Sequence, residues 1–234
     1  MTRDEVIAWM EENRDERGMK HWDRLGESGE GKMTSYGVGL TRLRKFAKQV
    51  GKSHELAGEL WEVANHEVKI VALLIDEPKK ITREQVEAQV EEVGPGSLGH
   101  VFSSCDAPLA KAAFAGELAA AWMESEDPVR RRCAYGLVYE LSKSTKKSAP
   151  GDDFYAGCIK RIEKDIQGEE NWVKGSMLGA FLGIGKRSKE LNAEAIRAVK
   201  AIGPVDVDYG DSGCEPLDVM KHLTSDRLRK KLTF

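Results

Sequence analysis

The sequence predicts an all-α fold in which pairs of helices stack into a solenoid. Apolar residues recur at helical spacing along most of the chain, and short polar breaks separate helical segments of roughly 10 to 17 residues. β-Strand signals are nearly absent, because the one alternating stretch, residues 205–209, is short and interrupted by aspartates. A single helical bundle is the structural alternative. At 234 residues the chain fits one domain spanning residues 1–234.

The first clear helices lie between residues 53 and 93. Ser53 is placed to cap a helix over residues 53–61, and a second helix follows over residues 66–75. Thr82 begins a third helix with a glutamine three residues on, which is the spacing of a capping box. A Gly-Pro-Gly break then ends the helical pattern.

The second half of the chain continues the same pattern. It contains a long alanine-rich helix and its partner, a further pair and one more helix, expected at residues 108–124, 128–141, 153–166, 171–184 and 192–202. Residues 18–36 hold four glycines and many charges, which is typical of a mobile connection. Residues 203–216 are expected to form a loop near the C-terminus, and neither stretch has the character of a domain boundary.

The composition excludes some classes of protein. No apolar run reaches the roughly 20 residues that span a bilayer, and the acidic N-terminus is unlike a signal peptide, so a cytoplasmic location is expected. The net charge of −3 excludes overall attraction to nucleic acid. Lysines and arginines nevertheless occur in bursts, at residues 42–45, 130–132, 143–147, 186–187 and 227–231. Such bursts are usually solvated helix faces, but they also bind nucleic acid when the fold gathers them on one surface.

Motifs for cofactors are absent or out of context. The four cysteines form no CxxC pair, so free thiols are expected rather than a zinc site or disulfides. Residues 94–99 match GxGxxG, but a dinucleotide site needs a preceding strand, and a helix is expected there. No cofactor and no metal ion are therefore expected. The five tryptophans are interpreted as core anchors.

Several stretches resemble the DNA alkylation repair (AlkD-type) family, and they occur in the family's order. They are Tyr36 to Lys45, His54 to Ile75, Val129 to Tyr135, Trp172-Val173-Lys174 and Ile184 to Arg187. The resemblance covers about residues 36–202. It implies a HEAT-like solenoid whose concave face holds duplex DNA. Active members are glycosylases that remove cationic N3- and N7-alkylated purines. In them a carboxylate stabilises the developing sugar cation, tryptophans frame the lesion and an arginine holds the DNA backbone.

The family's catalytic positions carry over only in part. Its first tryptophan and its aspartate, four residues apart, fall either on Gly96 and His100 or on Phe102 and Asp106. An imidazole cannot replace a carboxylate beside a developing cation. Asp106 is therefore the candidate catalytic residue, although capping a helix that starts near residue 108 would equally explain it. The second framing tryptophan falls on Gly179.

The family's arginine corresponds to Arg132, and the cations near it suggest one DNA-facing patch. We expect this patch to consist of Arg130, Arg131, Arg132, Lys174, Lys186 and Arg187. The sequence thus predicts a protein that binds duplex or distorted DNA with little or no alkylpurine glycosylase activity. The alternatives are an active glycosylase and a solenoid scaffold for a protein partner.

Overall fold

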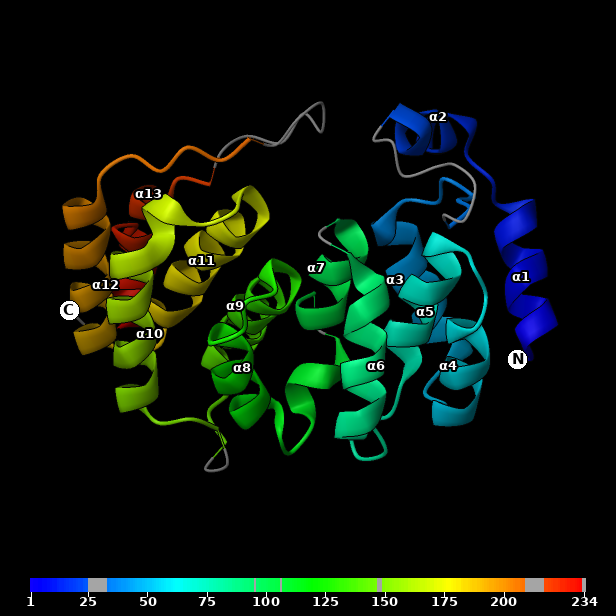
Figure 1. Cartoon of the computed structure of the whole chain (residues 1–234), viewed down its shortest axis with the longest axis horizontal. Coiled ribbons are helices and arrows are strands. Elements are labelled where there is room, and N and C mark those ends of the chain that lie inside the picture. Colours follow the sequence, from blue (N-terminus) through cyan, green and yellow to red (C-terminus); the bar gives the residue numbers. More distant parts are fainter. Residues whose placement is uncertain (25–32, 95, 106, 147–148, 209–216, 233–234) are drawn as a thin grey trace. The chain divides into compact units, whose positions relative to one another are not determined.

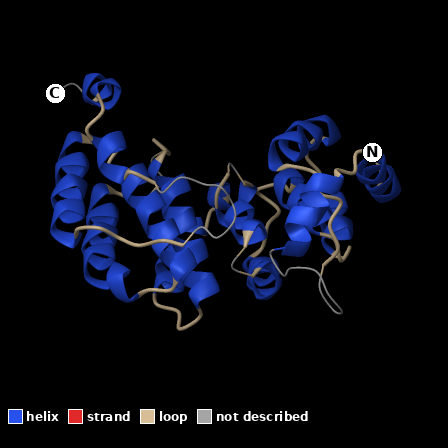
Figure 2. Cartoon of the chain, turned by 90° about the horizontal axis from the view of Figure 1, so that it is seen from above, coloured by secondary structure: helices blue, strands red, loops and turns tan. Residues whose placement is uncertain are grey.

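The computed structural model describes residues 1–24, 33–94, 96–105, 107–146, 149–208 and 217–232, and these residues form helices without a β-strand (Figure 2). Thr34 and Asn65 form one isolated parallel bridge. No helix in the described ranges is long and apolar enough to cross a membrane. The predicted all-α class is therefore confirmed.

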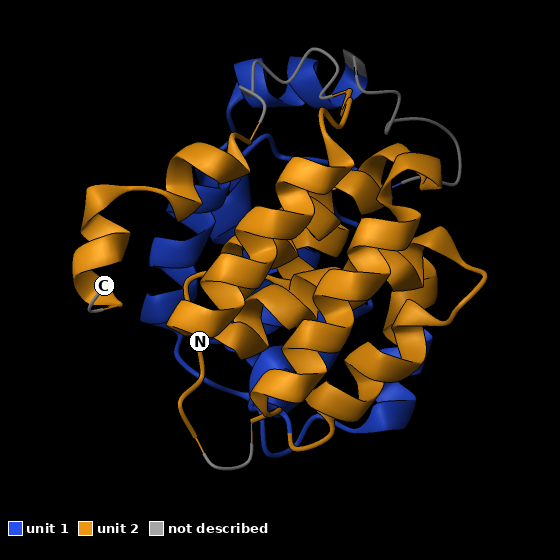
Figure 3. Cartoon of the chain, turned by 90° about the vertical axis from the view of Figure 1, so that its left-hand side faces the viewer, with its two compact units in different colours: residues 1–88, 106–112 blue, residues 89–105, 113–234 orange. Residues whose placement is uncertain are grey.

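The chain divides into two compact units, coloured separately in Figure 3. Unit 1 holds residues 1–88 and 106–112, and unit 2 holds residues 89–105 and 113–234. Helices that begin in unit 1 are α1 Arg3–Glu12, α2 Glu16–Arg24, α3 Leu40–Val50, α4 His54–Trp61, α5 His66–Ile75, α6 Arg83–Val93 and the 3-10 helix η1 Pro108–Lys111. Unit 2 contains α7 Ser97–Ser103, α8 Ala115–Met123, α9 Pro128–Ser142, α10 Asp152–Asp165, the 3-10 helix η2 Ile166–Gly168, α11 Asn171–Ile184, α12 Lys189–Ile202, α13 Val219–Leu223 and α14 Asp226–Lys231.

Most of the expected helices are present at their expected ends. The Ser53 hydroxyl accepts a hydrogen bond from the Leu56 amide at 3.2 Å, so it caps α4 as predicted. Thr82 likewise accepts from the Gln85 amide at 3.1 Å. The side chain of Gln85 does not return to the Thr82 backbone, because it donates to Asp76 instead.

One expectation about local structure is wrong. The single helix expected over residues 108–124 is split into η1 and α8, because Ala112 is extended (ψ 147°) and buries its side chain. Packing here overrides the high helix propensity of alanine. Of the expected mobile connection, residues 18–24 belong to α2, in which Trp22 packs against His66 with ring centroids 4.3 Å apart. Residues 25–32 lie outside the described residues, so the mobility of this connection stays a prediction. Four shorter or terminal helices, α1, α7, α13 and α14, were not predicted.

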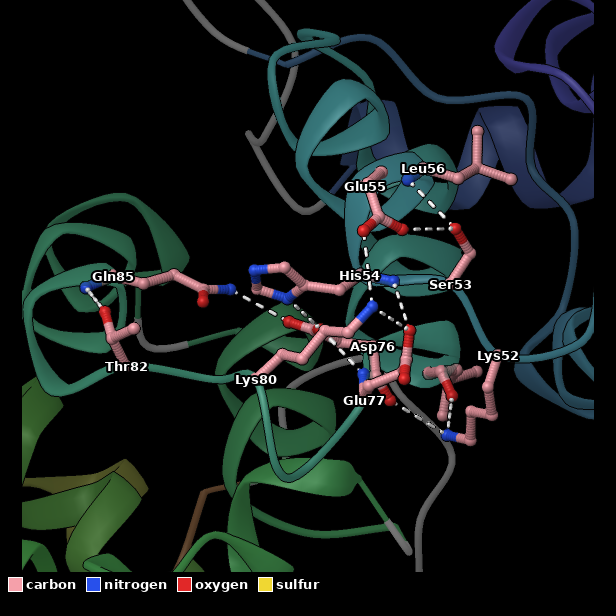
Figure 4. A network of polar contacts seen from close by, with 11 residues as sticks. Lys52, Ser53, His54, Glu55, Leu56, Asp76, Glu77, Lys80, Thr82 and Gln85 are labelled. Carbon is pink, nitrogen blue, oxygen red and sulfur yellow. Dashed lines mark hydrogen bonds and ion pairs between the residues drawn. The ribbon is translucent and has the colours of Figure 1, made fainter.

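In unit 1 the ends of α4, α5 and α6 meet on the buried carboxylate of Asp76 (Figure 4). Its oxygens accept hydrogen bonds from His54 Nδ1 at 2.7 Å, Gln85 Nε2 at 2.8 Å and the Glu77 amide at 2.7 Å. Lys52 Nζ donates to the Leu74 carbonyl at 2.7 Å, so part of the open C-terminus of α5 is also satisfied. This network fixes the α4–α5 pair to α6, the helix that follows it.

In unit 2 helix α9 packs against both α8 and α11 (Figure 1). A Cβ atom at Gly183 of α11 would lie 2.5 Å from Ser142 Oγ and 2.8 Å from a ring carbon of Tyr139. Only glycine therefore allows α9 and α11 to approach so closely near their C-terminal ends. A Cβ at Gly179, one turn earlier on α11, would meet nothing within 4 Å.

These two glycines give a matched stability test within one helix. Gly183→Ala is expected to lower the free energy of unfolding by about 1–3 kcal/mol, because the methyl group overpacks the contact with α9. Gly179→Ala is expected to raise it by about 0.5–1 kcal/mol, because alanine favours a helix and nothing obstructs it. Urea unfolding followed by circular dichroism measures both changes. Equal effects of the two substitutions would contradict the close packing of α9 on α11.

Candidate nucleic-acid interface

Arg132 lies in the second turn of α9 and is buried, with 5% of its surface exposed. The helix begins at Pro128, and the Asp127 carboxylate caps it by accepting from the Val129 amide at 2.9 Å. The guanidinium lies next to Gly99 of α7, and its carbon is 5.6 Å from the centroid of the Trp172 ring of α11. Three helices of unit 2 thus surround one arginine.

The guanidinium of Arg132 is a buried charge with unused hydrogen-bond donors. Among the described residues none accepts from its Nε or Nη1, and both atoms are buried. Burial lowers the pKa of Arg132, against smaller opposing effects of Cys133 and Cys105. Buried charges are normally paired, because leaving one unpaired costs several kcal/mol in rough terms. An anionic group able to reach these two donors would therefore be bound strongly.

Gly99 is needed to leave room for this arginine. A Cβ atom at residue 99 would clash with Arg132 Nη1 and would lie 2.6 Å from the Gly94 carbonyl oxygen. Gly99, the last glycine of the GxGxxG match at residues 94–99, therefore has a steric role. Sequence reasoning missed that role because no spacing rule connects Gly99 with Arg132.

Trp172 is the exception to the expectation that the tryptophans are core anchors. Trp22, Trp61 and Trp122 are buried, and the half-buried Trp9 stacks on the core residue Phe46. Trp172, by contrast, is 46% exposed at the start of α11. Its ring lies over the Arg132 guanidinium in a cation–π arrangement. An exposed indole beside a buried arginine can stack on a base while the arginine contacts a phosphate.

The two arginines before Arg132 are already paired with carboxylates. Arg130 forms ion pairs with Asp127, at 3.1 Å, and with Glu91. Arg131 makes a bidentate contact to Glu169, with both N–O distances 2.8 Å, and it also donates to two backbone carbonyls. The side-chain bonds to Glu169 raise the pKa of Arg131. Their contact with DNA stays a prediction, and it would compete with these pairs.

The remaining cations of the predicted patch lie at two ends of α11. Lys174 is half-buried in the first turn, two residues after Trp172. Lys186 and Arg187 follow the other end of the helix. Arg187 donates to Asp152 at 2.8 Å and to the carbonyls of Ser142 and Ser144, so it connects segments of unit 2. The structure thus brings Lys174 to the end of α11 that carries Trp172, and Lys186 to the opposite end.

The positions matched to the family's framing residues have different surroundings. Gly96 is the N-cap of α7, and His100 Nε2 lies 3.0 Å from Cys105 Sγ. Phe102 is 1% exposed and packs in the core against Trp122, with ring centroids 6.2 Å apart. Gly179 lies two helical turns after Trp172, and the space beside it is open.

The candidate carboxylate Asp106 lies outside the described residues. The residue that precedes η1 as its N-cap is Ala107, which offers no side-chain hydrogen bond. No group of three or more metal-ligating side chains occurs in the part of the chain that the structure describes.

Cys133 and Cys158 are free thiols, as expected. Cys133 and Cys158 are buried and Cys105 is half-buried, while Cys214 falls outside the described residues. Burial raises the pKa of Cys133 to about 11 and that of Cys158 to about 12. These two buried thiols are therefore unreactive at neutral pH.

The fold of this chain matches that of a protein of known structure. The fold is that of a solved structure described as "A new family of proteins related to the HEAT-like repeat DNA glycosylases with affinity for branched DNA structures", with a TM-score of 0.82. The two chains are 19% identical, and the match covers 100% of this chain and 97% of that one. The protein is thus an all-α HEAT-like solenoid.

The chain belongs to the DNA alkylation repair enzyme family, whose model matches residues 6–205. Two curated relatives are uncharacterized proteins from Listeria. Lin0241 of Listeria innocua serovar 6a is 26% identical over 202 residues, which are 83% of this chain and 84% of the relative. Lmo0209 of Listeria monocytogenes serovar 1/2a is 25% identical over 204 residues, 84% of this chain and 85% of the relative. The resemblance found in the sequence is confirmed.

Proposed function

We propose that this protein binds duplex DNA, prefers distorted or branched DNA, and has little or no alkylpurine glycosylase activity. The observation that carries the proposal is the buried Arg132, whose Nε and Nη1 have no acceptor among the described residues and whose guanidinium lies beside the exposed ring of Trp172. Membership of a DNA alkylation repair family and the branched-DNA affinity ascribed to the structural neighbour support the same partner.

A phosphate and an unstacked base together satisfy this site. A phosphodiester oxygen accepts from guanidinium donors with charge assistance, and that contact carries no sequence information. A base released from its neighbours stacks on an indole face whatever its identity, with roughly 1–3 kcal/mol per base. Branch points and distorted duplexes supply such unstacked bases at low cost. The arrangement therefore favours DNA structure over DNA sequence.

The positions that would frame a lesion argue against efficient base excision. Gly179 supplies no ring, and the alternatives for the first framing residue are Gly96 and a Phe102 that is committed to the core. Without aromatic walls an alkylated purine is not held in place for attack at its sugar. The carboxylate contributed by Asp106 would then lack a positioned substrate.

Equilibrium binding to DNA of different structures tests the proposal. Fluorescence anisotropy is measured with equal lengths of linear duplex, single strand and four-way junction at several salt concentrations. We expect junction affinity to exceed linear-duplex affinity, and both to fall with salt because counterions are released. Absence of binding to every DNA at low salt would leave the protein-binding scaffold as the better function.

A base-release assay separates the binding protein from the glycosylase. Duplex DNA carrying N7-methylguanine or N3-methyladenine is incubated with excess protein, and free base is measured. We expect release no faster than in buffer alone, since the positions matched to the family's framing tryptophans offer no ring to the lesion: Gly96 and Gly179 are glycines, and Phe102 is buried in the core. Release at the rate of an active family member would refute this expectation. Its loss in Asp106→Asn would then identify the carboxylate.

A further inference from the structure

A second group of cations lies at the C-terminal ends of α9 and α11, away from Arg132. It consists of Lys143, Lys186, Arg227 and Lys231, which we call the distal cluster. These residues come from the end of α9, the residues after α11, and α14. The sequence showed them only as three separate bursts of positive charge.

Hydrogen bonds from the Arg187 side chain to backbone carbonyls hold Lys143 and Lys186 near each other. Arg187 Nη1 donates to the carbonyls of Ser142 and Ser144, at 3.3 and 2.7 Å, and these two residues flank Lys143. Lys186 directly precedes Arg187. The end of α9 is thereby fixed beside the end of α11.

Helix α14 is brought to the same place by a buried asparagine. Asn192 is 3% exposed, and its Nδ2 donates to the Gly185 carbonyl at 2.7 Å and to the Leu223 carbonyl at 3.2 Å. Leu223 ends α13, and α14 starts three residues later. Arg227 and Lys231, four residues apart, are exposed and share one face of α14.

The positive charge of the distal cluster is only partly neutralised. Glu140 pairs with Lys143 at 2.8 Å, and Asp152 is engaged by Arg187. Lys186, Arg227 and Lys231 form no ion pair with another described residue. Partial burial lowers the pKa of Lys186, and the charges of Lys231, Lys143 and Arg227 lower it further. Like charges held together in this way are relieved by an external anion.

The distal cluster is too far from Arg132 to act on the same phosphate. Lys143 follows Arg132 by 11 residues of the chain, almost all within α9. At 1.5 Å per residue these positions are about 16 Å apart along the helix. The two sites therefore occupy opposite ends of the packed α9–α11 pair.

We propose that the distal cluster is a second binding site for the phosphodiester backbone, and that it holds a second duplex arm of a branched DNA. The inference rests on the proposed function and adds a surface to it. The site at Arg132 has a stacking residue, Trp172, and would bind the unstacked branch point. The distal cluster has cations alone and would bind the phosphodiester backbone of a regular duplex. Lysines and arginines without an aromatic partner fit such sequence-independent contact.

The test compares charge removal at the distal cluster with equal charge removal elsewhere in unit 2. The cluster variant combines Lys186→Gln, Arg227→Gln and Lys231→Gln. The matched control combines Lys160→Gln, Lys164→Gln and Lys200→Gln, exposed positions on α10 and α12. A third variant, Arg227→Gln with Lys231→Gln, changes only exposed residues and protects the test against misfolding of the first. Unfolding curves verify that all three variants remain folded.

If the distal cluster holds a second duplex arm, the loss of DNA affinity in the cluster variant should depend on the structure of the DNA. The cluster variant should bind a four-way junction at least about 10-fold more weakly than the parent, while linear-duplex affinity changes less than about twofold. The slope of the logarithm of junction affinity against the logarithm of salt concentration should become shallower by up to about 2.7, which is about 0.9 for each lost phosphate contact. The control should match the parent on both DNAs.

Three results would overturn the inference. Equal losses on junction and linear DNA would place the cluster in the footprint of a single duplex. Unchanged binding of both DNAs would make it solvated surface or a contact for an acidic protein segment. A junction loss in the control as large as in the cluster variant would reveal an effect of net charge alone. If the parent binds no DNA, the proposed function itself fails, which is a distinct outcome.

Discussion

Replacing Arg132 with methionine is expected to remove most DNA affinity without weakening the fold. Truncating a buried charge that contacts a charged partner costs about 2 kcal/mol or more, so binding should fall at least about 30-fold. Stability should respond in the opposite direction, because the free protein no longer buries two donors that have no acceptor among the described residues. Replacement of buried charges by apolar residues of similar volume is often neutral or stabilising by about 1–4 kcal/mol. Loss of function with unchanged or higher stability is the signature of a binding residue.

Urea unfolding and anisotropy titration on the same preparation measure both effects. Arg131→Met is the matched control, since it removes an adjacent arginine whose donors are already taken by Glu169 and two carbonyls. We expect the control to lose stability, because Glu169 is left without its partner, and to lose less DNA affinity than Arg132→Met, because any contact of Arg131 with DNA competes with that ion pair. If Arg132→Met lowers stability as much as the control does, Arg132 is a structural residue and the interface lies elsewhere.

The helices of this fold could be predicted because their signals are local. Caps such as Ser53, the proline that starts α9 and the apolar spacing of α10 and α11 each act within a few residues, so their ends were placed closely. The split between η1 and α8 could not be predicted, since η1 packs against α5, which is distant in the sequence, and Ala112 after it is extended and buried. The two-unit division also depends on such contacts.

The sequence predicted the arginine of the candidate site, but it did not predict the residues around that arginine. The family resemblance identified Arg132, but not the room that Gly99 leaves or the exposed ring of Trp172. The patch of six cations mixed two kinds of residue that look alike in a sequence. Arg130, Arg131 and Arg187 are occupied by carboxylates or carbonyls, which only side-chain geometry reveals. Their part in DNA binding stays a prediction.

The largest loss of stability is expected from Asp76→Ala. A carboxylate can only accept hydrogen bonds, so the contact with His54 fixes Nδ1 as the protonated ring nitrogen. The substitution leaves three donors without their acceptor, namely His54 Nδ1, Gln85 Nε2 and the Glu77 amide. Removing one member of a buried polar network costs roughly 3–5 kcal/mol, because the partners are left unsatisfied.

Two further substitutions show whether burial determines this loss. Asp76→Asn keeps one acceptor oxygen and should be intermediate in stability. Lys80→Ala removes two ion pairs, to Glu55 and Glu77, in the same network, but they lie at the surface, where solvent weakens them (Figure 4). Its urea midpoint should therefore stay close to that of the parent. The order Lys80→Ala, Asp76→Asn, Asp76→Ala in increasing loss is the expected result. If Lys80→Ala costs as much as Asp76→Ala, surface charge rather than the buried carboxylate holds α4, α5 and α6 together.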